Sequence, residues 1–149
     1  INKAIEEGIL SDNFKKNFEK IGSVNTTEMS HYLEMPHNQE YKLVQCVADN
    51  SSDAENLWYI LEAIIKRASK MTAANLASAV LKTEYGKNPI HPLCINADGT
   101  TFYKTKYLEQ YTKYYLLQYL QEKHNRYVDF VRIENSPVIG AAIAALGLN

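Results

Sequence analysis

The sequence predicts an α/β protein, and within that class an α+β chain in which helices outnumber strands. Apolar residues recur at helical spacing through the first half of the chain, as at Phe14 and Phe18. Two later runs, residues 93–97 and 127–133, have the length and composition of buried strands. A helical pattern over residues 108–124 separates them, and a strand–helix–strand crossover implies parallel strands with helices packed against the sheet.

Composition sets limits on size and partners. The chain has 149 residues, of which 46% are hydrophobic and 22% charged, so we expect one domain with a substantial core. The net charge of −1 provides no general attraction for nucleic acid. No apolar run approaches the roughly 20 residues that a spanning helix needs, so no membrane partner is expected. Because the chain begins with Ile1, we also expect it to be part of a longer protein.

Cysteine and histidine usage gives no sign of a metal site. Cys46 and Cys94 each lie inside an apolar run, and neither has a second cysteine at metal-ligand spacing. We therefore expect two buried thiols in a reducing compartment, which predicts a cytoplasmic location. No helical metal-ligand spacing relates the four histidines, which are His31, His37, His91 and His124.

Four helices are expected before residue 50. A short one over residues 2–10 breaks near Gly8, and the next runs from Asp12 to Gly22. Asn25 with Glu28 forms a capping pattern for a third helix, which Pro36 ends. Tyr41, Val44 and Val47 indicate a fourth, before a polar loop over residues 48–52.

A long helix follows, and after it the spacing of apolar residues changes from a helical to a strand pattern. Ser52 and Glu55 form a second capping pattern, and apolar spacing continues to Val80, with Gly86 and Pro89 beyond it. After the strand at 93–97, residues 101–105 are predicted to be its hairpin partner across an Asp-Gly turn. The last helix is predicted to begin at Pro137, with residues 141–148 as its body.

The turn Asp98-Gly99-Thr100-Thr101 is a candidate phosphate-binding loop. Gly99 allows a ligand to approach the backbone, and successive amide N–H groups in such a turn can hold an anion. Two threonine hydroxyls and the charge of Lys104 would add to this. Asp-Gly is also the favoured pair for an ordinary hairpin turn, and the pattern alone favours that simpler interpretation.

Two helix starts are further candidates. Thr26, Thr27 and Ser30 lie at a predicted helix N-terminus, where unpaired N–H groups and the helix dipole attract anions, although the helix cap alone explains this pattern. Ser136 and Gly140 lie where a strand leads into a small-residue helix, so a flat ligand could lie against the backbone. Close helix–sheet packing explains the same small residues.

Five segments, in this order, resemble the C-terminal part of hexokinases, the ATP-dependent hexose kinases. The segments are EEGIL at 6–10, VNTTEMSHYLE at 24–34, RASKMTAANLASAV at 67–80, INADGTTFYK at 95–104 and VDFVRIENSPVIGAA at 128–142. At the positions of the last three segments, hexokinases have in turn an Arg-Ala-Ala helix, an Asp-Gly-Thr/Ser turn followed by Tyr-Lys, and a Ser-Glu-Asp-Gly-Ser-Gly-x-Gly-Ala-Ala segment. The resemblance covers nearly the whole chain.

The resemblance implies a fold and a ligand. The fold would be part of the actin-like, sugar-kinase ATPase group, with a ribonuclease-H-like sheet and many helices, and residues 1–149 would form the nucleotide-binding C-terminal region of the large lobe. ATP with Mg²⁺ would contact Asp98, Gly99, Thr100, Thr101 and Lys104 through its phosphates. On the other side of the nucleotide the resemblance implies contacts from Thr26, Thr27 and Ser30, and for adenosine from Ser136 and Gly140.

What is absent shapes the predicted function. The first phosphate loop of hexokinases, Asp-Leu-Gly-Gly-Thr-Asn-Phe-Arg, and the segment with the catalytic aspartate do not occur in these 149 residues. Phosphoryl transfer needs a base for the attacking hydroxyl, so the chain is predicted to contain no catalytic residue and to act with an N-terminal lobe of the same protein. The intact protein would transfer a phosphoryl group from ATP to the 6-hydroxyl of a hexose in glycolysis.

One departure from the family keeps a second function open. Pro137 and Val138 bring side chains where hexokinases have bare glycine backbone, and Thr27 stands where the family often has lysine. The alternative is therefore a hexokinase-like sensor that binds a sugar or nucleotide without catalysis. A helical interaction module without a small ligand is a third possibility.

Overall fold

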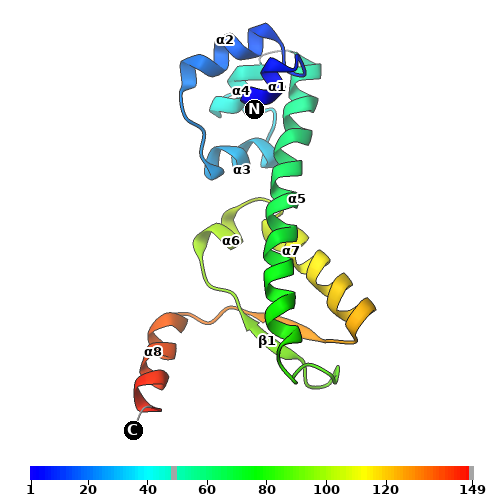
Figure 1. The fold of residues 1–149 in the computed structure, drawn as a ribbon. Helices are drawn as coiled ribbons and strands as arrows, with labels where there is room; N and C mark the ends of the chain where they lie inside the picture. The colour runs from blue at the N-terminus through cyan, green and yellow to red at the C-terminus, as the bar shows by residue number, and fades with distance from the viewer. Residues whose placement is uncertain (48–49, 148–149) are drawn as a thin grey trace.

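A computed structural model describes residues 1–47 and 50–147 of the chain. The polar loop predicted over residues 48–52 and the predicted end of the last helix at Leu148 lie partly outside these residues. Figure 1 shows the elements, which follow one another in this order: α1 (Asn2–Glu6), α2 (Asp12–Ile21), α3 (Thr26–Glu34), α4 (Lys42–Val47), α5 (Ser51–Leu81), β1 (Leu93–Asn96), α6 (Thr100–Lys104), α7 (Leu108–Leu117), the π-helix η1 (Gln118–Glu122), β2 (Val128–Val131) and α8 (Ser136–Leu146).

The 31-residue helix α5 connects two separate hydrophobic cores (Figure 1). Its N-terminal half buries Leu57 and Leu61 against α2, α3 and α4, where Phe14 and Tyr32 are fully buried. Its C-terminal half buries Ala77 in a second core with α7, η1 and β2. Large apolar residues fill the first core, whereas alanines let α7 approach α5 closely in the second.

A buried carboxylate joins the starts of α2 and α5. Asp53, only 3% exposed, accepts hydrogen bonds from the Ser11 N–H at 2.9 Å, the Ser11 hydroxyl at 2.5 Å and the Asn50 side-chain amide at 2.9 Å. Asn50 also accepts from the Ser52 and Asp53 N–H groups, so Asn50 caps α5 and the predicted cap at Ser52 is wrong. These donors compensate the burial of a charged group.

Strands β1 and β2 form a parallel pair, which confirms the crossover prediction. Leu93 lies opposite Val128 and Asn96 opposite Val131, with α6, α7 and η1 in the connection. Gly86 adjoins the start of β2, where its carbonyl accepts from the Tyr127 N–H at 2.7 Å. A Cβ at Gly86 would lie 2.7 Å from the Tyr127 oxygen, so only glycine fits there. The chain is thus mixed α/β and helix-rich, with a small parallel sheet.

The predicted hairpin at 101–105 is wrong. Residues 100–104 form the short helix α6, which begins after Gly99, whose φ of 133° favours glycine. Two aromatic contacts fix this helix beside the strands: the Phe102 ring stacks on Phe130 of β2 at 6.2 Å, and the Tyr103 hydroxyl donates to the Ala97 carbonyl at 3.0 Å. The aromatic residues of the predicted strand therefore pack a short helix against the sheet.

Other boundaries and burials differ in detail from the sequence predictions. The helix expected over residues 108–124 changes to a π-helix after Leu117, and Ser136 rather than Pro137 is the first residue of α8. Cys46 is buried, which raises the pKa of its thiol to about 11, but Cys94 is exposed.

One helix stands apart: no residue of α8 is buried, and it projects from the rest of the chain in Figure 1. Among the described residues, no helix is long and apolar enough to cross a membrane.

Replacing Asp53 with alanine should lower the free energy of unfolding by about 2 kcal/mol, because the Ser11 and Asn50 donors would lose their acceptor in a buried position. Urea unfolding followed by circular dichroism measures this. Asp12→Ala is the control, because Asp12 is exposed in the first turn of α2 and its loss should cost less than about 1 kcal/mol. Equal losses in the two variants would contradict a special role for Asp53.

Candidate functional site

A polar cavity of about 490 Å³ lies between α3 and residues 100–105, which include α6 and are called the α6 segment below. The two face each other in Figure 1. It brings together residues more than 70 positions apart in the chain, because α3 belongs to the first core and α6 to the second half. Hydroxyl groups dominate its lining. The lining residues are Thr26, Thr27, Ser30, His31, Glu34, Thr100, Thr101, Tyr103, Lys104 and Thr105.

The α3 side of the cavity is set by a complete helix cap. The Asn25 side chain accepts from the Glu28 N–H at 3.0 Å, and the Glu28 carboxylate accepts from the Asn25 N–H at 3.1 Å, as the sequence predicted. Lys42 pairs with Glu28 at 2.8 Å, and with the Asn25 bond it lowers the pKa of the Glu28 carboxyl below its ordinary value. This cap fixes the direction in which Thr26 and Thr27 face.

Ser30 fastens the two sides of the cavity together. Its hydroxyl donates to the Lys104 carbonyl at 3.3 Å and accepts from the Lys106 N–H at 2.6 Å. Ser30 is only 4% exposed, so these two bonds cross the interface where water has little access. Much of the hydrogen-bonding capacity of this hydroxyl therefore serves to hold the α6 segment against α3.

The turn before α6 leaves its backbone donors unused by the protein. Within the described residues, the N–H groups of residues 98–101 make no hydrogen bond to a protein acceptor. Asp98, Gly99, Thr100 and Thr101 are exposed, so these donors are accessible to a ligand. Accessible successive amides beside threonine hydroxyls are suited to an anion such as phosphate.

In contrast to this turn, the start of α8 has, among the described residues, no backbone N–H group free for a ligand. The Val138 and Ile139 N–H groups both bond the Asn135 carbonyl, the Ser136 N–H bonds the Ile133 carbonyl, and Pro137 has no N–H. The Ser136 hydroxyl donates to the Asp98 carboxylate at 3.3 Å, so this segment lies beside the 98–101 turn. The first turn of α8 can offer an apolar surface near that turn, but no free amide.

Six of the ten predicted site residues line the cavity: Thr26, Thr27, Ser30, Thr100, Thr101 and Lys104. Asp98 and Gly99 form the adjoining turn, Ser136 contacts Asp98, and Gly140 lies in exposed α8 away from the lining. No group of three or more possible metal-ligating His, Cys, Asp or Glu residues occurs in the described part of the chain.

Four lining residues were not predicted as ligand contacts: His31, Glu34, Tyr103 and Thr105. The spacing of His31 and Glu34 could have revealed them, because they follow Thr27 by four and seven residues and so share its helix face. His31 stacks on Tyr41 with 4.5 Å between ring centroids, which holds it at the cavity wall. Glu34 opposes a bare anion here, whereas Lys104 favours one.

Fold and cavity together define the chain as a helix-rich α/β protein with a hydroxyl-lined polar site next to a parallel strand pair. The sequence model of the hexokinase family matches residues 1–147, so the chain belongs to the hexokinase family. Membership suggests a kinase role of the hexokinase type. No curated protein and no solved structure matches the chain.

Ser30→Ala should loosen the α6 segment, because the Lys106 N–H and Lys104 carbonyl would lose their partner. We expect hydrogen exchange at the Lys106 amide to accelerate about tenfold, the equivalent of one lost hydrogen bond. Amide exchange followed by NMR measures this, with Ser23→Ala at an exposed position as the control. Unchanged protection of Lys106 in the Ser30 variant would show that this bond does not hold the segment.

Proposed function

We propose that this chain is the nucleotide-binding C-terminal part of a hexokinase. The intact protein would transfer the γ-phosphoryl group of ATP to the 6-hydroxyl of a hexose in the cytoplasm, as a step of glycolysis. The observation that carries the proposal is the cavity between α3 and α6, since it unites two predicted phosphate-contacting segments from opposite halves of the chain. Family membership supports the same reaction class.

The cavity has the chemistry that a chain of phosphates requires. Threonine hydroxyls from both sides can donate to phosphate oxygens, and the amides of residues 98–101 add donors that need no rearrangement. Lys104 supplies a positive charge, and charge-assisted bonds to phosphate are stronger than neutral ones. In this proposal Ser30 mainly positions the α6 segment and makes at most a secondary contact with the ligand.

Mg²⁺ would enter as a complex with ATP. The described residues contain no cluster of carboxylates that could form a complete protein site. Mg²⁺ commonly keeps several waters and takes one or two protein carboxylates together with substrate phosphates. Asp98, exposed at the start of the turn and bonded to Ser136, would be one carboxylate able to contact such a complex through water.

Adenosine would lie toward α8, because the Ser136–Asp98 bond places the start of this helix next to the proposed phosphate turn. Gly140 and neighbouring alanines would give a flat ligand access to the backbone. Pro137 and the 69% exposed Val138 change this surface from the family pattern. The missing N–H at Pro137 is the observation that favours the second candidate function, a hexokinase-like module that binds without catalysis.

The chain alone should bind ATP without transferring its γ-phosphoryl group. No residue of the cavity is assigned as the base for a sugar hydroxyl, since the family segment with the catalytic aspartate is missing from the sequence. The base and the sugar contacts would come from an N-terminal lobe of the same protein. This division gives the described cavity a binding and positioning role.

Lys104→Gln should weaken ATP binding about fivefold, because it removes one partly solvated charge that faces the phosphates. Isothermal titration of the chain with Mg²⁺ and ATP measures the affinity. Lys87→Gln is the matched control, since Lys87 is an exposed lysine outside the cavity. If wild type binds ATP and the Lys104 variant binds it equally well, the assignment of the phosphates to this cavity is wrong.

A further inference from the structure

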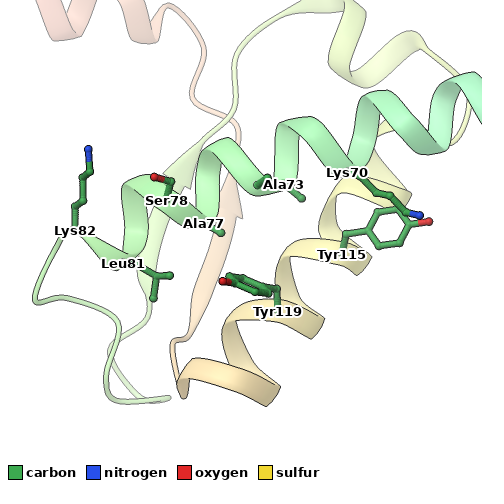
Figure 2. Close-up of a pocket in the computed structure, with 9 residues that line it drawn as sticks. Lys70, Ala73, Ala77, Ser78, Leu81, Lys82, Tyr115 and Tyr119 are labelled. Carbon is green, nitrogen blue, oxygen red and sulfur yellow. The ribbon is translucent and has the colours of Figure 1, made fainter.

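A second cavity, of about 660 Å³, forms a groove between α5 and α7. It shares no residue with the hydroxyl-lined cavity, and its volume falls within the range of about 300–1,000 Å³ typical of small-molecule sites. Figure 2 shows side chains from both helices directed toward the space between them. The lining residues are Lys70, Ala73, Ala74, Ala77, Ser78, Leu81, Lys82, Tyr115 and Tyr119.

Most of the groove is apolar. Ala73 and Ala77 are buried at its base, and their small side chains keep the two helices close while leaving the space above them open. The rings of Tyr115 in α7 and Tyr119 in η1 form the wall opposite α5, and Leu81 lies at one end of the row (Figure 2). An extended apolar chain would contact methyl groups on one side and aromatic faces on the other.

Lys70 provides a positive charge at the opposite end of the groove from Leu81. Its ammonium lies 5.1 Å from the centre of the Tyr115 ring. The described residues offer Lys70 no ion pair, whereas nearby Lys66 pairs with Glu62 at 2.9 Å and Lys113 with Glu109 at 2.6 Å. Since no carboxylate lines the groove, its electrostatic complement is an anion.

We propose that this groove binds a free amphiphilic carboxylate, with its head group at Lys70 and its apolar chain along the alanines toward Leu81 and Tyr119. The Tyr115 hydroxyl can donate a second hydrogen bond to the head group. Figure 2 shows Lys82 extending away from α7, so the charge is concentrated at the Lys70 end. A nucleic-acid strand would need a series of cations along the groove, which this lining lacks.

The first test uses dodecanoate below its micelle-forming concentration, titrated into the chain by calorimetry. Saturable binding is expected, and Lys70→Gln should weaken it about fivefold through loss of one charge contact. Lys20→Gln is the control, because Lys20 lies in α2 and outside the groove. Absence of binding to wild type, or equal weakening by both substitutions, would overturn the proposal.

A second pair of variants tests the apolar part of the groove. Ala74→Trp places a large ring in the groove from an exposed helix position and should abolish dodecanoate binding, while Asn75→Trp adds the same ring one residue outside the lining and should leave it intact. Circular dichroism confirms that both variants fold. Ile143→Ser on exposed α8 should also leave binding intact; if it abolishes binding instead, the ligand lies on α8 and the groove assignment fails.

Discussion

The continuity of α5 is the constraint on which the rest of the structure depends. One helix takes part in both cores, so the first half of the chain, with α3, is held at a fixed distance from the second half, with α6. Ser69 donates to the Leu108 carbonyl at 3.2 Å, which fastens α7 to the middle of this helix. Tyr111 donates to Glu62 nearby, and burial together with this carboxylate raises the pKa of Tyr111 to about 12. The phenol therefore remains a donor through the physiological range.

The same constraint explains why the candidate site can exist between distant segments. Two stretches had the composition of an anion site, and a third, at the start of α8, that of a site for a flat ligand; the use of their backbone donors now separates them. The amides of residues 98–101 are free within the described chain, those at the start of α3 are partly used by its cap, and those at the start of α8 are bonded or missing. Phosphate binding is therefore best supported at the 98–101 turn facing α3, and α8 is better suited to a neutral, flat part of a ligand.

The sequence predicted what depends on local pattern and left out what depends on contacts between distant residues. The spacing of apolar residues was sufficient to predict α5. The order strand, helix, strand along the chain was sufficient to predict that β1 and β2 are parallel. The hairpin prediction was wrong because it relied on the Asp-Gly pair, whereas the stacking of Phe102 on Phe130 and the bond from the Tyr103 hydroxyl to Ala97 hold these residues as a helix. Likewise, no local pattern shows that Ser30 bonds the backbone near Lys104, or that Cys94 is exposed. The cavity as a whole could be anticipated only through the resemblance to hexokinases.

The central claim is that the amides of the 98–101 turn and the hydroxyl-bearing start of α3 receive the same anion. Titration of the ¹⁵N-labelled chain with ATPγS and Mg²⁺, followed by NMR, tests it most directly. The account predicts saturable shifts, with one common affinity, in the amides of Gly99, Thr100 and Thr101 and of Thr26 and Thr27. Shifts confined to α8 or to the α5–α7 groove, with both segments of the cavity unchanged, would contradict it.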